Sequence, residues 1–314
     1  MPIIERDPWR LQYFEGVACP EGLVVPVEDP DAYTLFPEHR WVYNKLRICE
    51  TQGLPNGPHG LDPPSFPVFS KPIYTMRGMG IGSRVIASAE EYARSLQAGH
   101  MWMPLLTGEH VSSDVAVVDG DPAWWRHSTG TALAEGTFDY WTVWADAKPE
   151  LEQRLGDWLR RELRGYTGMV NLESIGGTII ECHLRFADQW PDLYGEGFVE
   201  SVIELYAHGR WQYADPDRRT GYSVVLFGGH GPHYRKVEPA LVEEVLARPG
   251  ISSVQITFHE DKPPEQHAMP PGGFRLAIVN CWDLDAGLRA REDLALGFWS
   301  TQRLGDARAA GSAP

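Results

Sequence analysis

Residues 167–185, TGMVNLESIGGTIIECHLR, decide the fold of this chain. The sequence predicts two short strands joined at Gly176-Gly177, with polar side chains at alternate positions. The polar residues are Asn171 and Glu173 on the first strand and Glu181, His183 and Arg185 on the second. Successive strand residues point to opposite faces, so each set shares one face. A turn centred on Gly176 would place Asn171 opposite Glu181 and bring both sets together.

A face that carries two acids, an amide, an imidazole and a guanidinium is costly to bury without a partner. We infer that the partner is a divalent cation that carries phosphates.

The bulk composition is that of a globular enzyme, with 43% hydrophobic residues and 12 Trp in 314 residues. The formal net charge of −15 argues against nucleic acid as the main partner, because phosphate backbones attract basic surfaces. A locally basic nucleotide pocket is still allowed.

Cysteine spacing and the absence of targeting segments predict a cytoplasmic protein. Four widely spaced cysteines form no metal or disulfide pattern, so we expect them to be reduced. The N-terminus does not have the pattern of a signal peptide. No stretch approaches the ~20 apolar residues of a membrane span, so no membrane partner is expected.

Periodicity along the rest of the chain predicts an α+β architecture, because hairpins alternate with some crossover helices. The expected strands are residues 22–27, 67–72, 84–87, 100–106, 110–119, 222–228, 253–259 and 274–281. The expected helices are residues 88–96, 149–163, 196–208, 237–248 and 283–298. In the first of these, Ser88 and Glu91 have the spacing of a capping box.

Residues 69–84, FSKPIYTMRGMGIGSR, form a second group. Lys71 ends a predicted strand, and Gly78, Gly80 and Gly82 alternate in the loop that follows. Glycines let backbone N–H groups approach a phosphate, and Lys71 supplies charge. A flexible surface turn explains the glycines equally well. The loop is neither a Walker loop nor a Rossmann fingerprint, because no Gly-Lys-Ser/Thr follows and the next element is a strand.

A third group is LLTGEHVSSD at residues 105–114. His110, Ser112 and Asp114 share one face of a predicted strand, which therefore either lines a cleft or is half exposed.

The order of these groups resembles that of the ATP-grasp superfamily. The matching segments are YNKLRI around Lys45, FPVFSKP with RGMGIGSRVIASAEEYA, MPLLTGEHVSSDVAV, and GMVNLESIGGTIIECHLR, over about residues 41–190. The resemblance implies an α+β, ATP-grasp fold with a nucleotide cleft between two lobes. It divides the chain into a short N-terminal segment (1–44), a small lid-bearing lobe (45–103), a large lobe with the hairpin (104–304) and a disordered tail (305–314).

The resemblance also implies roles for individual residues. ATP phosphates would be bound by Lys45, Lys71 and the lid glycines Gly78, Gly80 and Gly82. Adenine would meet the backbone from Met103 through Leu105 and Leu106, and His110 would lie at the ribose. The metal would be held by Glu181 with Glu173 or Asn171, and His183 occupies the place of a family asparagine. Arg185 would face the acyl phosphate. Independently of the resemblance, Arg275, at the start of a strand after a Pro/Gly loop, is the candidate for the acceptor carboxylate.

Departures from the family pattern affect the metal and the substrate pocket. Imidazole is a poorer Mg²⁺ ligand and suits Mn²⁺ or Zn²⁺ better, so His183 implies either one metal fewer or a different metal. The N-terminal segment is short for the family, which leaves open a pocket completed by a second subunit in a homodimer.

The predicted function is an ATP- and Mg²⁺-dependent ligase that joins a small carboxylic acid to an amine through an acyl phosphate. Two alternatives remain at this point: a non-catalytic nucleotide-binding relative and a small-molecule kinase.

Overall fold

A small antiparallel sheet forms one lobe of the molecule. The computed structural model describes residue 3 and residues 8–76, 80–133, 136–229, 234–263, 267 and 272–298. The small sheet has the order β1-β4-β2-β3. Its strands are β1 (Gly57–Pro58), β2 (Val68–Pro72), β3 (Arg84–Ile86) and β4 (His100–Pro104). Val68, Ile86 and Trp102 pack with Tyr92 of α3 (Ala89–Arg94), so this lobe has its own apolar core.

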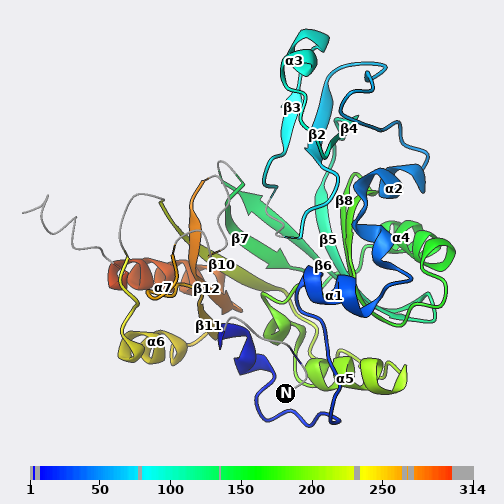
Figure 1. Ribbon diagram of the computed structural model, residues 1–314. Helices are drawn as coiled ribbons and strands as arrows, with labels where there is room; N and C mark the ends of the chain where they lie inside the picture. The colour runs from blue at the N-terminus through cyan, green and yellow to red at the C-terminus, as the bar shows by residue number, and fades with distance from the viewer. Residues whose placement is uncertain are drawn as a thin grey trace, which may run out of the picture.

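An eight-stranded antiparallel sheet forms the large lobe, with the order β11-β12-β10-β7-β6-β5-β8-β9. The strands are β5 (His110–Val118), β6 (Asp121–Ala132), β7 (Phe138–Val143), β8 (Gly168–Ile175), β9 (Thr178–His183), β10 (Gly221–Gly228), β11 (Ile251–Ile256) and β12 (Phe274–Cys281). Figure 1 shows the small sheet and α3 projecting from one side of this large sheet. β9 is an edge strand, which leaves one row of its backbone groups outside the ladder.

Helices cover both faces of the large sheet. The helical elements are η1 (Pro8–Tyr13), α1 (Asp29–Leu35), η2 (Arg40–Tyr43), α2 (Lys45–Glu50), α4 (Pro149–Glu162), η3 (Pro191–Tyr194), α5 (Phe198–His208), α6 (Pro239–Leu246) and α7 (Leu284–Gly297). Val115 packs with α4 on one face, whereas its neighbour Ala116 packs with α5 on the other. α6 and α7 cover the end formed by β10, β11 and β12.

Within the described residues one predicted strand is absent, and several elements, among them α1 and α2, were not predicted. The strand predicted at residues 22–27 is wrong: Val25 and Val27 are buried, but the segment is not part of a sheet. The long hairpin of β6 and β7 was not predicted. Its strand β6 buries Arg126 and His127, which pair with Asp215 and Glu152, so these polar residues hide the apolar alternation.

None of the helices in the described part of the chain has the length and apolar character needed to cross a membrane.

Candidate functional site: an acidic hairpin facing two lysines

A β-bulge in the hairpin of β8 and β9 decides which side chains share a face. The turn uses Gly176 and Gly177, whose φ angles of 56° and 79° suit glycine. Beyond the turn the register shifts, so that Ile180 is left out of the described pairing and Glu173 stands opposite Glu181. If β9 kept the register of the turn and Ile180 stayed in the ladder, Glu173 would face Ile180 and the two acids would lie on opposite faces.

The observed pairing of the two strands also differs from the prediction at Asn171. Asn171 stands opposite His183, so the prediction that it lies opposite Glu181 is wrong. Its Nδ2 donates to Ser112 Oγ at 2.8 Å and to Asp114 Oδ1 at 2.7 Å. These bonds hold the amide against β5, and the geometry therefore favours Glu173 over Asn171 as the acid that accompanies Glu181.

Glu173, Glu181 and His183 form a cluster that fits a divalent cation. Their ligand atoms all lie within 4.8 Å of one another. A cavity of about 10 Å³ adjoins Glu181 and His183, which is close to the space that one water molecule needs. Two carboxylates and an imidazole are common ligands of divalent metal ions in proteins.

Lys45 and Lys71, which the sequence predicted to contact phosphates, both lie beside this hairpin. Lys45 is 4% exposed, and its Nζ is 3.6 Å from Glu181 Oε1. Lys71 is 2% exposed, and its Nζ donates to the carbonyl of the bulge residue Ile180 at 2.8 Å. Burial lowers the pKa of Lys71, although the charge of Glu181 opposes that effect. Two buried ammonium groups beside two carboxylates match the needs of a metal-bound polyphosphate.

His110 extends the cluster from the start of β5. Its Nε2 is 3.3 Å from Glu173 Oε2, and this hydrogen bond raises the pKa of His110 despite burial. Burial alone would raise the pKa of Glu173, but His110 and His183 hold it below its usual value. Glu173 is therefore charged at neutral pH and able to bind a cation.

Asp29, at the start of α1, was missed by the sequence analysis. Its two carboxylate oxygens both lie 3.0 Å from His183 Nδ1, and Arg185 Nε donates to Oδ1 at 2.9 Å. Burial lowers the pKa of His183, but Asp29 outweighs it and the net pKa is raised. Burial would raise the pKa of Asp29, yet Arg185 and His183 keep it below its usual value. The only sequence signal was an acidic stretch, EDPD, about 150 residues from its partners.

The remaining predicted residues lie around the hairpin or outside it. Met103 is in β4 opposite Phe69, and Leu105 and Leu106 follow that strand. Gly80 and Gly82 have φ angles of 62° and 78°, and a Cβ on Gly82 would come within 3.2 Å of His100 Nε2. Gly78 and the predicted tail at residues 305–314 lie outside the described residues.

Arg275, the candidate for the acceptor carboxylate, is in β12. Its Nη1 donates to Gln189 Oε1 at 3.2 Å, and its guanidinium lies 5.2 Å from the Trp9 ring centroid. These contacts place Arg275 against η1 and the loop that follows the hairpin.

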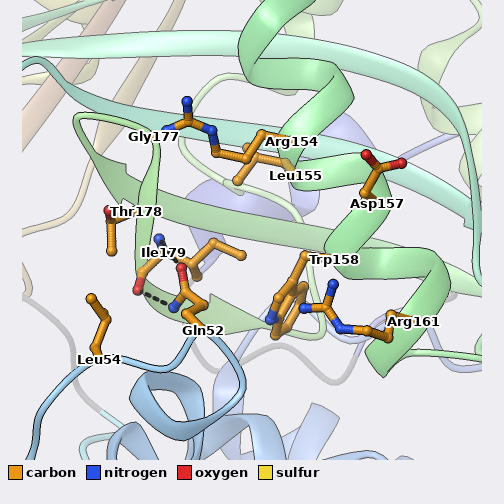
Figure 2. Close-up of a pocket in the computed structure, with 10 residues that line it drawn as sticks. All are labelled: Gln52, Leu54, Arg154, Leu155, Asp157, Trp158, Arg161, Gly177, Thr178 and Ile179. Carbon is orange, nitrogen blue, oxygen red and sulfur yellow. Dashed lines mark hydrogen bonds between the residues drawn. The ribbon is translucent and has the colours of Figure 1, made fainter.

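A larger pocket, of about 360 Å³, lies on the α4 side of the hairpin. Figure 2 shows Arg154, Trp158 and Arg161 of α4 around it, with Gln52 bonded to the backbone of Ile179. The acidic cluster does not line this pocket. We place the candidate site on the face of the hairpin that carries Glu173 and Glu181, because Lys45 and Lys71 lie beside these acids.

This arrangement of two lobes, glycine turn, lysines and acidic hairpin is the ATP-grasp fold, and solved structures share it. The chain superposes on an L-amino acid ligase from Bacillus licheniformis with a TM-score of 0.56 and 15% identity, covering 81% of this chain and 71% of that one. It superposes on N5-carboxyaminoimidazole ribonucleotide synthetase from Thermus thermophilus with a TM-score of 0.58 and 18% identity, covering 92% and 84%.

A third similar structure contains a nucleotide and a metal. It is the biotin carboxylase domain of the Hydrogenobacter thermophilus 2-oxoglutarate carboxylase, a dimer in complex with MgADP and bicarbonate. The TM-score is 0.56 at 15% identity, over 78% of this chain and 62% of that one. The sequence matches no protein-family model, and no curated protein matches it. At these identities the likeness establishes the fold.

Proposed function

We propose that this protein is an ATP-dependent ligase that joins a small carboxylic acid, such as an amino acid, to an amine. The observation that carries the proposal is the approach of two lysines to the acidic hairpin: Lys45 lies beside Glu181, and Lys71 donates to the carbonyl of the adjacent Ile180. Both lysines are buried, and a buried ammonium is stabilised by a charged ligand. The ligases of the same fold described above support the reaction class.

In this proposal Glu173 and Glu181 hold a divalent cation, and Lys45 and Lys71 hold the phosphates. The cation would offset the charge of the nucleotide while the γ-phosphoryl group of ATP moves to the carboxylate, which gives ADP and an acyl phosphate. The amine would then attack the acyl carbon, forming the amide bond and releasing phosphate. The lysines would stabilise the same charge, and loss of one such contact costs about 3 kcal/mol in the barrier. Their burial keeps water away from the transferring group.

Phosphate release tests this proposal. The full chain is incubated with ATP, Mg²⁺ or Mn²⁺, and pools of amino acids with and without added amines. We expect turnover that depends on one pool and falls at least about 100-fold in Glu181→Gln. Glu50→Gln is the matched control, because Glu50 is on α2 but pairs with the exposed Arg47. No turnover with any pool, together with no nucleotide binding, would refute the proposal.

A second candidate function is nucleotide binding without catalysis. It is favoured by the ion pair between Asp29 and Arg185, because that pair neutralises the arginine expected to face the acyl phosphate. Both functions predict thermal stabilisation by ATP, since a ligand at a hundred times its dissociation constant adds about 2.7 kcal/mol, and phosphate release separates them. ATP stabilisation without phosphate release from any pool supports the second candidate.

A further inference from the structure

We infer that Asp29 orients His183 as the third ligand of the cation site, which makes this site selective for a divalent transition-metal ion over Mg²⁺. The inference deepens the proposed function, since it concerns the cation bound by Glu173 and Glu181. It rests on the geometry of one histidine and on a residue that lies 154 positions earlier in the chain.

The ring of His183 is fixed by contacts at one nitrogen. Nδ1 lies 3.0 Å from each oxygen of Asp29, and Asp29 is itself held by Arg185 and by the hydroxyl of Tyr43, at 3.4 Å. His183 and Asp29 are both 4% exposed. A carboxylate only accepts hydrogen bonds, so Nδ1 carries the hydrogen and, in the neutral ring, Nε2 carries the lone pair.

The other nitrogen points at the acids without bonding to them. Nε2 is 3.6 Å from Glu181 Oε2 and 3.9 Å from Glu173 Oε1, both beyond hydrogen-bond distance. Nε2 makes no hydrogen bond to any residue that the structure describes. Glu181 and His183 also line the cavity of about 10 Å³. The ligand atoms of His183 and of the two acids all lie within 4.8 Å of one another, so a lone pair and two carboxylates converge.

This ligand set distinguishes between metals. Mg²⁺ binds oxygen and keeps its waters, whereas imidazole favours first-row transition metals. A histidine whose far nitrogen donates to a carboxylate is the usual form of such a ligand, and loss of the carboxylate typically costs 10- to 100-fold in metal affinity. Asp29 is thus a positioning residue that acts through His183.

Mn²⁺ alone is the probe, used on the full chain without nucleotide. Continuous-wave EPR measures the Mn²⁺ dissociation constant, competition measures Mg²⁺, and pulsed EPR detects coupling between bound Mn²⁺ and ¹⁴N. We expect ¹⁴N coupling in the native protein and its loss in His183→Asn. The same variant should bring the Mn²⁺ and Mg²⁺ affinities closer together.

Asp29→Asn should weaken Mn²⁺ binding 10- to 100-fold. Glu28→Gln is the matched control, because it removes a charge from the adjacent residue, which pairs with Arg10 and not with His183. Circular dichroism checks that each variant is folded. If Asp29→Asn unfolds, His183→Asn still decides the question, since Asp29 keeps Arg185 as a partner.

Absence of Mn²⁺ binding, bound Mn²⁺ without ¹⁴N coupling, or an unchanged preference in His183→Asn would each overturn the inference. Because ATP is omitted, these results are independent of whether the protein proves to be a ligase.

Discussion

Replacing Gly176 with alanine tests whether the hairpin turn is fixed by the junction between the lobes. The turn packs against the segment that follows β4: a Cβ on Gly176 would lie 2.6 Å from the carbonyl oxygen of Thr107. Gly176 N also donates to Glu109 O at 3.0 Å. Because Thr107 O belongs to the backbone, it cannot rotate away, and either the turn or the junction must move.

The expected loss of unfolding free energy in Gly176→Ala has two parts. A positive φ costs alanine roughly 1–2 kcal/mol, and overpacking against the backbone adds about 1–3 kcal/mol. Gly165→Ala is the matched control, because Gly165 also has a positive φ of 82° but a Cβ there meets nothing within 4 Å. The difference in unfolding free energy between the two variants isolates the contact with Thr107.

Urea unfolding followed by tryptophan fluorescence measures that difference. We expect Gly176→Ala to be the less stable variant by about 1–3 kcal/mol and to lose cation binding, since the displaced turn carries Glu181 with it. Equal stability of the two variants would refute the idea that the turn is clamped.

Three other predictions concern side chains that contact the hairpin of β8 and β9. Lys71→Met should abolish stabilisation by ATP in a thermal melt but change the unfolding free energy little, because the lost hydrogen bond is offset by the removed desolvation cost. Because the pKa of His110 is raised in the folded state, its pairing with Glu173 stabilises the fold below about pH 6.5. This stabilisation is lost as the pH rises through the folded pKa. The native protein and His110→Gln should therefore differ more in unfolding free energy at pH 5.5 than at pH 8.5. Gln52→Ala removes two hydrogen bonds from the edge strand at Ile179 and should cost about 1–3 kcal/mol in urea unfolding, whereas the exposed Gln153→Ala should have almost no effect.

Local signals predicted much of the fold. Ser88 accepts from the backbone N of Glu91 as the capping box predicted, and Glu91 in turn accepts from the backbone of Ala87. The apolar stripe of α4 buries Leu155, Trp158 and Leu159 as expected. Such features depend only on residues a few positions apart, so the sequence contains all the information needed.

Features that depend on distant partners could not be predicted in the same way. Arg126 is buried in β6 because Asp215, 89 residues away, neutralises it. Asp29 reaches His183 across 154 positions. The bulge at Ile180 is likewise not determined by the turn alone: its carbonyl accepts from Lys71 of the other lobe.

The bulge also has a consequence for how the length of this ribbon can change. Ile180 is the residue that the bulge adds, so deleting it alone would make β9 a regular strand with Glu181 still opposite Glu173 and His183 still opposite Asn171. Deleting a residue that has a partner in the ladder, such as Cys182, would instead turn His183 to the opposite face. Divergent copies of this chain should therefore tolerate the loss of one residue at the bulge, at the expense of the carbonyl that accepts from Lys71.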